Sequence, residues 1–326
     1  MRDFSLEFPL AYGSLTASAI FRAQPEDFQV DEDLGYLPSG FGEHVFLHVC
    51  KRGENTAWVA GKIAELAGVN INDVGYCGRK DRHAVTAQWF SVYLPKAPEP
   101  DWSLINSSTI QVLSASRHQH KLRRGEHQQN HFVIRLRDVQ TSDHQQLQQR
   151  IATVFEKGVP NYFGEQRFGL GGNNLHEAEA ILVQGKRYKD KQKRGLMLSA
   201  ARAYLFNLVL AARVQANNWT IMMDGEVHER VSGPLWGRGR SLVSGEQREF
   251  EEAALADWEN WCDGLEHAGL LQERRPLQLF ARNPHYEWDD NDLVLRFSLD
   301  AGEFATSILH ELFTLQTQQT NDESTA

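Results

Sequence analysis

One short segment combines the residue types that an acid–base or nucleophilic reaction needs. It reads Gly78-Arg79-Lys80-Asp81-Arg82-His83 and comes just before residues 88–94, which have the composition of a strand. A carboxylate placed among cations suits a reaction that an ionised group performs beside a polyanion. The same residues are also typical of a solvated, salt-bridged turn, which is the more common role of a charged segment. Asp81 is therefore a candidate catalytic residue whose role depends on the rest of the chain.

Two other segments offer side chains that could act beside this carboxylate. Arg22 precedes the proline turn Pro25-Glu-Asp-Phe28 and, if near Asp81, would hold the carboxylate ionised and oriented. Asn130 and Phe132 open a strand-like run, where Asn130 could hydrogen-bond a base or Asp81 and Phe132 could stack on an extruded base. The alternatives are an ordinary turn into an edge strand, a loop-ending asparagine and a core phenylalanine.

The composition is that of an ordinary soluble globular protein, long enough for one large domain or two medium ones. The start of the chain lacks the basic and apolar regions of a signal peptide, and no apolar run approaches the roughly 18–20 residues that cross a bilayer. Cys50, Cys77 and Cys262 form no CxxC pair, and no histidine falls in a metal-ligand spacing. We therefore predict a reduced, cytoplasmic protein without a metal, a membrane segment or a small-molecule cofactor.

The net charge of −9 argues at first against a nucleic-acid partner, but the charge is unevenly distributed. Residues 161–202 carry 8 Lys+Arg against 4 Asp+Glu, whereas residues 203–326 carry 9 against 21. Because salt screens charges over about 8 Å, a bound polyanion feels the local patch more than the total charge. Two basic patches could be solvated faces or could bind a phosphate backbone. The first patch contains Arg117, Lys121, Arg123 and Arg124; the second contains Lys186, Arg187, Lys189, Lys191, Lys193 and Arg194.

A third segment, residues 161–174, is rich in aromatic, amide and glycine residues and precedes a helix-like run. Its glycine spacing differs from that of a dinucleotide fingerprint. It could be a hinge between domains, or its backbone amides and Arg167 could contact phosphates and bases. Both roles can hold together.

Periodicity along the chain predicts an α+β protein. Alternation with period two predicts strands at residues 28–32, 44–49, 88–94, 109–113, 131–137 and 292–299. Helical periodicity predicts helices at 57–66 (capped by Asn55 and stopped by Gly68), 142–157 (stopped by Gly158), 175–184, 198–214, 249–268 and 304–312. The region from 158 to about 280 is mainly helical, whereas the last strand and helix resemble the first half. This order indicates an inserted domain, and the tail from residue 316 should be disordered.

Taken together, the motifs resemble the tRNA pseudouridine synthase D family in the family's order, over residues 22 to 307. The matching pieces are Pro25-Glu-Asp-Phe28, Gly78-x-Lys80-Asp81-x-His83-Ala-Val-Thr86, Asn130-x-Phe132, Val159-Pro-Asn-Tyr-Phe-Gly-x-Gln-Arg-Phe-Gly169, Leu198-Ser-Ala-Ala-Arg202 and Gly302-x-Phe304-Ala-Thr-Ser307. The resemblance implies a pseudouridine synthase-type catalytic domain with a mixed, largely antiparallel sheet flanked by helices. It would be formed by residues 1–157 and completed by 281–326, with a mainly helical, family-specific domain inserted at 158–280.

The resemblance also implies isomerisation of uridine to pseudouridine in tRNA, at position 13 of the D arm. Asp81 would be the catalytic nucleophile or base, and no cofactor would be needed. The substrate would contact Arg22, Phe28, Lys80, Asn130, Phe132 and Phe304. The partner would be tRNA, and we expect a monomer.

Two positions depart from the family pattern. Arg22 stands where a lysine is expected, which keeps the charge but changes the donor geometry. Gln129 stands where a glycine usually precedes the asparagine. A second hypothesis, from another class, is an RNA-binding or tRNA-folding module without catalysis.

Overall fold

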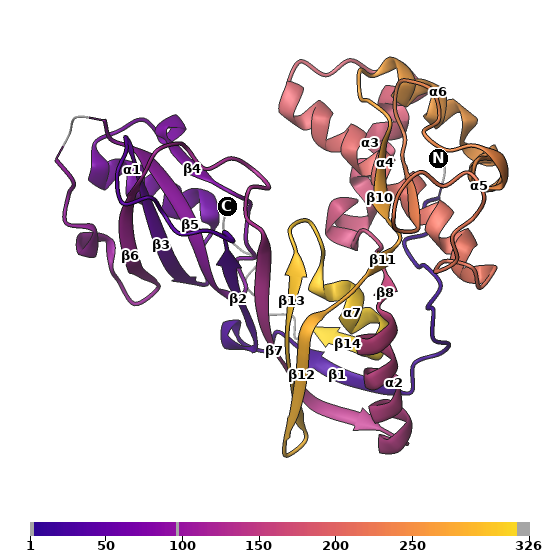
Figure 1. Cartoon of the computed structure of the whole chain (residues 1–326), viewed down its shortest axis with the longest axis horizontal. Helices are drawn as coiled ribbons and strands as arrows, with labels where there is room; N and C mark the ends of the chain where they lie inside the picture. The colour runs from indigo at the N-terminus through magenta and orange to yellow at the C-terminus, as the bar shows by residue number, and fades with distance from the viewer. Residues whose placement is uncertain (1–2, 96–97, 318–326) are drawn as a thin grey trace. The chain divides into compact units, whose positions relative to one another are not determined.

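The computed structural model describes residues 3–95 and 98–317, and the chain divides into two compact units (Figure 1). The sheet unit comprises residues 16–147, 281–305 and those from 313 onward. The helical unit comprises the residues up to 15, 148–280 and 306–312. Each unit is thus assembled from separate stretches of chain. The insertion predicted at 158–280 falls within the long stretch of the helical unit, which begins at residue 148.

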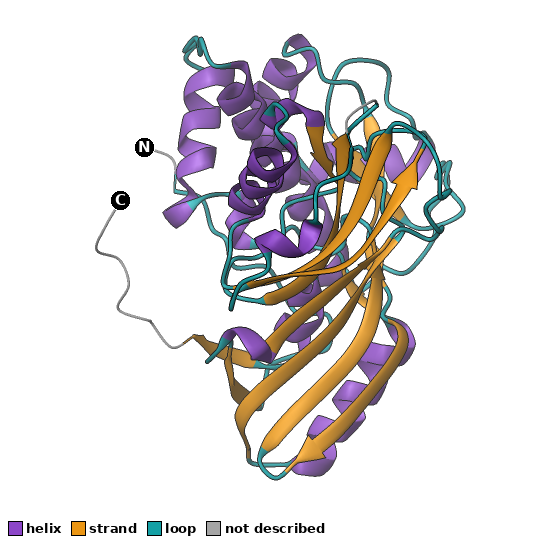
Figure 2. Cartoon of the chain, turned by 90° about the vertical axis from the view of Figure 1, so that its left-hand side faces the viewer, coloured by secondary structure: helices purple, strands orange, loops and turns teal. Residues whose placement is uncertain are grey.

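A mixed sheet forms the sheet unit and has ten strands within the described ranges (Figure 2). Its main path runs β12-β13-β7-β2-β5-β3-β6, while β1 pairs with β7 and β14, and β4 pairs with β5. The strands are β1 Ala17–Phe21, β2 Phe28–Asp33, β3 His44–Arg52, β4 Val74–Tyr76, β5 Val85–Tyr93, β6 Ile110–His118, β7 Gln129–Thr141, β12 Arg282–Asp289, β13 Asp292–Asp300 and β14 Thr314–Thr317. The pairs β2–β5 and β1–β14 are parallel and the other pairs are antiparallel. The predicted α+β class with a largely antiparallel mixed sheet is confirmed.

The long strand β7 holds the sheet together. Its first half lies between β13 on one side and β2 on the other, and its last residues pair with β1. Alternate side chains from Asn130 to Leu136 are buried, as period-two geometry requires. Asn130 and Phe132 are therefore on the buried face of a strand that is hydrogen-bonded along both edges, which fixes their register.

Helix α1 (Thr56–Ala67) covers one face of the strands β3 and β5. The Asn55 side chain accepts a hydrogen bond from the Ala57 N–H at 3.1 Å and caps the helix. Gly68, with φ of +65°, ends it in the left-handed conformation that glycine tolerates best. The apolar face of α1 includes Val59 and Ile63, and each such buried side chain contributes about 1.5–3 kcal/mol.

The helical unit packs around one long helix, α4 (Lys191–Gln215). Its other helices are α3 Asn173–Leu182, α5 Gly245–Ala254 and α6 Glu259–His267, with most of α2 (His144–Lys157) and α7 (Ala305–Leu312). Two short ladders complete it: β8 Val159–Pro160 pairs with β11 Gln278–Leu279, and β9 Ser232–Leu235 pairs with β10 Glu273–Pro276. Gly158, with φ of +73°, joins α2 to β8, where a Cβ would lie 2.5 Å from the Leu279 carbonyl oxygen. Both the positive φ and the close carbonyl oxygen therefore disfavour a side chain at this position.

By length and composition α4 is apolar enough to cross a membrane, contrary to our expectation that no segment approaches this limit. The most apolar part of the helix is 61% buried within the protein. It packs against residues such as Trp261 and Leu265 of α6. A core helix that is apolar on most of its surface passes the same test, and α4 is such a helix.

Several predicted boundaries were wrong for physical reasons. The helix expected at 249–268 is broken at Leu255, which ends α5 and buries its side chain in the apolar core before α6 begins at Glu259. Helix α4 begins at Lys191, not at 198, because Asp190 caps it through the Gln192 and Lys193 N–H groups. Strands β1 and β14 were missed, since their pairing partners are distant in sequence. Strand β12 pairs with the adjacent β13 and was missed because its side chains are mostly exposed and polar.

The expectation for the tail was wrong at its start. Residues 316 and 317 belong to β14, which pairs with β1 in parallel register. A strand is recognised here by its partner and not by its own polar composition. The remaining residues of the predicted disordered tail lie outside the described residues.

Asn207 supplies a test of how the segment after β8 is held. Its fully buried amide accepts from the Phe163 N–H and donates to the Phe163 carbonyl oxygen, both at 2.9 Å. Asn207→Ala leaves both groups without partners, so the free energy of unfolding should fall by about 2–5 kcal/mol in urea titrations. The control Gln215→Ala, at an exposed position near the end of α4, should change it by less than about 0.5 kcal/mol. Equal stabilities of the two variants would contradict this assignment.

Candidate active site

The loop between β4 and β5 carries Asp81 and is tied to the sheet unit by the buried side chains of Thr56 and Gln88. Thr56 accepts from the Lys80 N–H at 3.0 Å and contacts Gln88 at 2.9 Å. Gln88 in turn donates to the Gly78 carbonyl oxygen at 3.2 Å. Thr56 and Gln88 are fully buried, so these bonds are shielded from competition by water. The loop is therefore a fixed part of the fold.

The carboxylate of Asp81 is held by one donor on each oxygen. Its Oδ1 accepts from the His83 N–H at 2.9 Å, and its Oδ2 lies 2.7 Å from the Arg22 guanidinium. The side chains of Asp81 and Arg22 are each 18% exposed, so the ion pair is partly shielded yet reachable. The predicted pairing of Arg22 with Asp81 is present in the structure.

Arg22 is itself constrained from several directions. It follows β1 with φ of +60°, an uncommon conformation for a residue that is not glycine. Its guanidinium lies over the rings of Phe21 and Phe28, 4.6 and 4.4 Å from their centroids. Burial lowers the pKa of Arg22 and the charge of Asp81 opposes this, so the guanidinium stays protonated. Backbone strain of this kind clusters at functional sites.

The proline turn sets the direction in which Phe28 enters β2. Asp27 is buried, accepts from the Gln24 N–H at 3.1 Å and receives a forked pair of bonds from Arg137 at 2.7–3.0 Å. A bidentate pair of this kind fixes both partners in orientation. The sequence indicated a turn here, and the structure shows what anchors it.

The aromatic side chains of the site form a row. The rings of Phe28 and Phe132 lie 6.0 Å apart, and Phe132 stacks on Phe297 at 5.5 Å. Phe132 is only 7% exposed, so in this structure most of its ring surface is covered by protein. Phe304 lies before α7 and is 37% exposed. Stacking of a base on either ring stays a prediction.

The side chain of Lys80 does not contact the carboxylate of Asp81. Its ammonium lies 2.6 Å from the Glu32 carboxylate and donates to Asn130 Oδ1 at 2.5 Å. Asn130 Nδ2 in turn contacts His127 Nε2 at 3.1 Å. These bonds fix which way the Asn130 amide faces. Contact of Lys80 and Asn130 with a substrate stays a prediction.

Sequence reasoning missed Glu32 and His127, which have no motif of their own. Both are buried, and with Cys77 they place possible ligand atoms within 4.8 Å of one another. Zinc takes ligands of these types. Here, however, Glu32 is already neutralised by Lys80, and burial raises the pKa of the Cys77 thiol to about 12, which disfavours the thiolate. The cluster is therefore better explained as a support for Lys80 and Asn130 than as a metal centre.

Sequence reasoning also missed Lys51, near the end of β3. Its side chain is 0% exposed, and its ammonium donates to the carbonyl oxygens of Glu54 at 2.7 Å and Asp81 at 3.1 Å. Burial lowers the pKa of Lys51 to about 8, while the charge of Asp81 opposes the shift. A shift of this size costs about 3 kcal/mol of stability at neutral pH. The available signal was that period-two alternation places Lys51 on the same face of β3 as the buried Val45, Leu47 and Val49.

The first basic patch is only partly available to a ligand. Arg117 pairs with Glu99 and donates to the Leu94 carbonyl oxygen at 2.7 Å, and Lys121 donates to the Asn72 carbonyl oxygen. Arg123 and Arg124 are exposed. Lys121 and Arg124 line a groove of the sheet unit together with Ile71 and Tyr76.

The second basic patch is more open. Lys186 pairs with Glu177 at 2.6 Å, whereas Arg187, Lys189, Lys191 and Lys193 are exposed and make no ion pair within the described part of the chain. Arg194 is half-buried in the first turn of α4. Cations at the start of a helix oppose its dipole, so this patch is not explained by helix stability. Arg167 is half-buried, with its guanidinium 5.4 Å from the Phe163 ring centroid.

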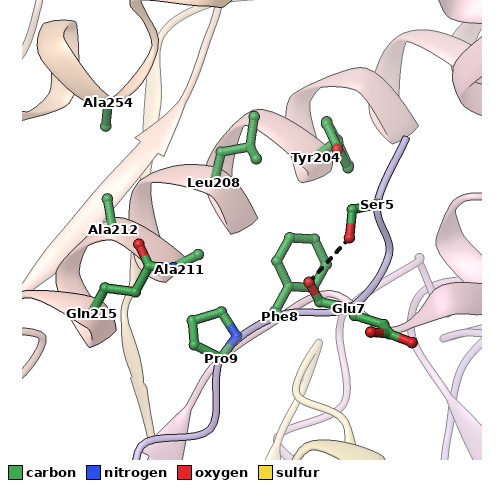
Figure 3. Close-up of a pocket in the computed structure, with 10 residues that line it drawn as sticks. All are labelled: Ser5, Glu7, Phe8, Pro9, Tyr204, Leu208, Ala211, Ala212, Gln215 and Ala254. Atoms are coloured by element: carbon green, nitrogen blue, oxygen red, sulfur yellow. Dashed lines mark hydrogen bonds between the residues drawn. The ribbon is translucent and has the colours of Figure 1, made fainter. Parts of the chain in front are cut away.

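A separate pocket lies in the helical unit, beside the N-terminal segment (Figure 3). It is lined by Ser5, Glu7, Phe8, Pro9, Tyr204, Leu208, Ala211, Ala212, Gln215 and Ala254. Glu7 is the only ionisable carboxylate among these lining residues, and no cation faces it there. The pocket lacks the paired charges of the Asp81 site and is not the candidate active site.

An oriented carboxylate on a loop of a mixed sheet, with a guanidinium and an aromatic row beside it, indicates an enzyme site. The fold is that of the pseudouridine synthases. A solved structure from Methanosarcina mazei that carries the name tRNA pseudouridine synthase D matches it with a TM-score of 0.66 at 17% identity, covering 94% of this chain and 95% of the other.

Sequence comparisons define the family. The family described as tRNA pseudouridine synthase D (TruD) matches residues 11–190. The protein named tRNA pseudouridine synthase D from Cellvibrio japonicus is 58% identical, covering 97% of this chain and 96% of the relative. The one from Aeromonas hydrophila is 47% identical and covers 93% of each chain. The chain belongs to the tRNA pseudouridine synthase D family and is an isomerase, as the resemblance implied.

The buried pair between Glu32 and Lys80 gives a stability test. Glu32→Gln leaves the Lys80 ammonium without its counter-charge, so thermal and urea unfolding should show a loss of about 3–5 kcal/mol. Adding Lys80→Met to this variant should restore much of the loss. Glu252→Gln, which breaks an exposed pair with Arg248, is the control and should cost less than about 1 kcal/mol. A loss in the double variant as large as in Glu32→Gln would contradict the pairing.

Proposed function

We propose that this enzyme converts uridine to pseudouridine at position 13 in the D arm of tRNA, with Asp81 as its catalytic carboxylate. The observation that carries the proposal is the ion pair between Asp81 and Arg22, set in a loop that buried side chains hold in place. The family membership supports the reaction class. The position in the tRNA rests on the motifs shared with the family.

The reaction needs one anionic group at the ribose. The N1–C1′ bond of uridine breaks, uracil turns, C5 joins C1′, the C5 proton leaves and N1 gains a proton, so the composition is unchanged. Asp81 either attacks C1′, forming a bond that is later broken, or removes the 2′-proton to give a glycal. Arg22 and the His83 N–H would keep the carboxylate aimed in both cases. No cofactor is required by this balance.

The target base must leave its stack before it reaches Asp81, at a cost of a few kcal/mol. Stacking on an aromatic ring offsets about 1–3 kcal/mol. Phe28, Phe132 and Phe304 are the proposed ring contacts, and Asn130, held by Lys80 and His127, would hydrogen-bond the base edge. Because Phe132 is covered in this structure, a stacked base would need Phe132 or its neighbours to shift.

The basic patches would bind the tRNA backbone. The exposed cations of residues 187–193 and of residues 123–124 are the favoured contacts, because their side chains are not engaged in ion pairs within the described ranges. Arg117, Lys121 and Lys186 are already partnered and would contribute less. Arg167 and the amides of residues 161–174 remain proposed contacts to phosphates or bases. We also propose that residues 158–280 are the family-specific domain and that the enzyme acts as a monomer in the cytoplasm.

The alternative is an RNA-binding or tRNA-folding module without catalysis. It would need the basic patches but would give no reason for an oriented carboxylate beside Arg22. Incubation of the purified protein with unmodified tRNA, without cofactors, followed by pseudouridine mapping separates the two. A tRNA in which uridine 13 is replaced by cytidine tests the position.

Asp81→Asn should abolish tritium release from tRNA labelled at uracil C5, because the amide is neither a nucleophile nor a base of comparable strength. Binding of tRNA should persist, since the phosphate contacts lie elsewhere. The matched control is Asp31→Asn on β2, whose side chain is 57% exposed, and it should release tritium at the normal rate. Near-normal turnover of Asp81→Asn would exclude Asp81 as the catalytic group.

The combined variant Lys189→Gln, Lys191→Gln and Lys193→Gln tests the second basic patch. Each lost phosphate contact should lower the slope of log K against log salt by roughly 0.7–0.9, so the slope should fall by about 2–3 and affinity should weaken at low salt. Filter binding at several salt concentrations measures both. Lys62→Gln, on the exposed surface of α1, is the control. Unchanged affinity of the triple variant would mean that the patch is a solvated face.

A further inference from the structure

Lys51 is a fully buried cation of the sheet unit whose position the fold alone does not explain. Its ammonium has no carboxylate within ion-pair distance in the described residues. It donates hydrogen bonds to two backbone carbonyl oxygens instead. One of them belongs to Glu54, in the turn before α1. The other belongs to Asp81.

We propose that Lys51 is a positioning residue for Asp81, and that the charge on its ammonium controls how firmly the Asp81 loop is held for reaction. This inference rests on the proposed role of Asp81. Lys51 does not touch the carboxylate of Asp81. Its ammonium binds the backbone carbonyl oxygen of Asp81, while Arg22 and the His83 N–H bind the Asp81 side chain. The two sets of contacts together fix both the place and the direction of the carboxylate.

The cost of burying this charge argues that it serves function. A buried ammonium destabilises the fold, and an apolar side chain of similar length would suit the core better. What the apolar side chain could not provide is a donor to the Asp81 carbonyl oxygen. Hydrogen bonds from a charged donor are roughly twice as strong as neutral ones, so loss of the proton would weaken the hold without removing Lys51 from its place.

The surroundings make this charge sensitive to pH. The ionisable groups that act on Lys51 are Cys50 on its own strand, Glu54 in the next turn, and Lys80 and Asp81 in the loop. Burial is the largest influence and lowers the pKa of Lys51 from 10.5 to about 8. Lys80 adds to this shift, whereas Asp81, Glu54 and Cys50 oppose it. The proton is therefore lost within the range where the enzyme can be assayed.

Loss of the Lys51 proton should raise the stability of the fold but lower the activity. Because the pKa of Lys51 is lower in the folded protein, the unfolded chain binds more protons between pH 8 and 10.5. Lys51 therefore opposes folding most strongly below pH 8, and this penalty fades as pH rises toward 10.5. Activity should fall over the same window, since the neutral amine holds Asp81 less firmly.

The experiment compares wild-type enzyme with Lys51→Met and Lys51→Arg in single-turnover assays on unmodified tRNA from pH 6.5 to 9.5. The wild-type rate should fall as pH passes about 8. Lys51→Met should be slower by about tenfold or more at pH 7 and should lack this fall, because misplacing a catalytic group costs up to about a hundredfold. Lys51→Arg, which cannot lose its proton, should keep a measurable rate without the fall. Titration of the substrate itself is common to all variants.

Two further measurements separate positioning from damage to the fold. Affinity for tRNA should be the same in wild type and Lys51→Met, since Lys51 is fully buried. The melting temperature of wild type relative to Lys51→Met should rise between pH 8 and 10, while Lys62→Met, at an exposed site on α1, should show no such difference. If Lys51→Arg does not fold, the comparison of wild type with Lys51→Met still shows whether Lys51 causes the fall in rate above pH 8.

The inference is overturned if active wild-type enzyme and Lys51→Met have equal rates, or if both show the same fall above pH 8. An inactive wild-type enzyme would instead reject the proposed function. The melting-temperature comparison would then still show whether Lys51 titrates as a buried cation.

Discussion

The site depends on keeping one carboxylate fixed in the loop between β4 and β5 of the mixed sheet. Asp81 has a donor on each oxygen, from Arg22 and from the His83 backbone, and its loop is bound to Thr56 and Gln88. Each contact is ordinary alone. Together they restrain the carboxylate in place and in direction, which is what preorganisation means in physical terms. The uncommon backbone of Arg22 is tolerated because its guanidinium is held by both Asp81 and two rings.

Around this carboxylate the fold buries more charge than stability alone would favour. Lys80 is paired with Glu32 and directed to Asn130, and Lys51 is held on carbonyl oxygens. Buried charges that lose their partners are costly, so such networks tolerate few arrangements. They explain why Lys80, next to Asp81 in sequence, turns away from it. The two buried ammonium groups are stabilised differently. Lys80 has the Glu32 carboxylate as a counter-charge, whereas Lys51 has only the dipoles of two backbone carbonyl groups.

The helical unit is stabilised mainly by apolar packing around α4. Its core is a continuous apolar cluster around α4, and Asn207 binds backbone in the segment after β8. The same segment carries the aromatic and glycine residues that the family shares. This unit also buries charge, because Arg274 pairs with Glu226 and Glu251, and all three side chains are at most 3% exposed. Apolar packing forms most of this core, and buried polar side chains, both neutral and charged, hold the chain against it. The exposed cations before and within the first turn of α4 are the part of this unit that packing does not explain.

Sequence alone determined the α+β class, the cap and stop of α1, most strands of the sheet and the family, because alternation, capping residues and ordered motifs are local signals. It also indicated Arg22 as the partner of Asp81. The tertiary structure decided which side chains share the site: Glu32, His127 and Lys51 have no motif, and they reach it only because β2, β3 and the loop before β7 meet there. Strands such as β14 and the break at Leu255 were likewise invisible, since pairing and burial are made by residues far apart in sequence. Long-range packing, unlike capping or periodicity, leaves little trace in neighbouring residues, and that is why only the fold could place these groups.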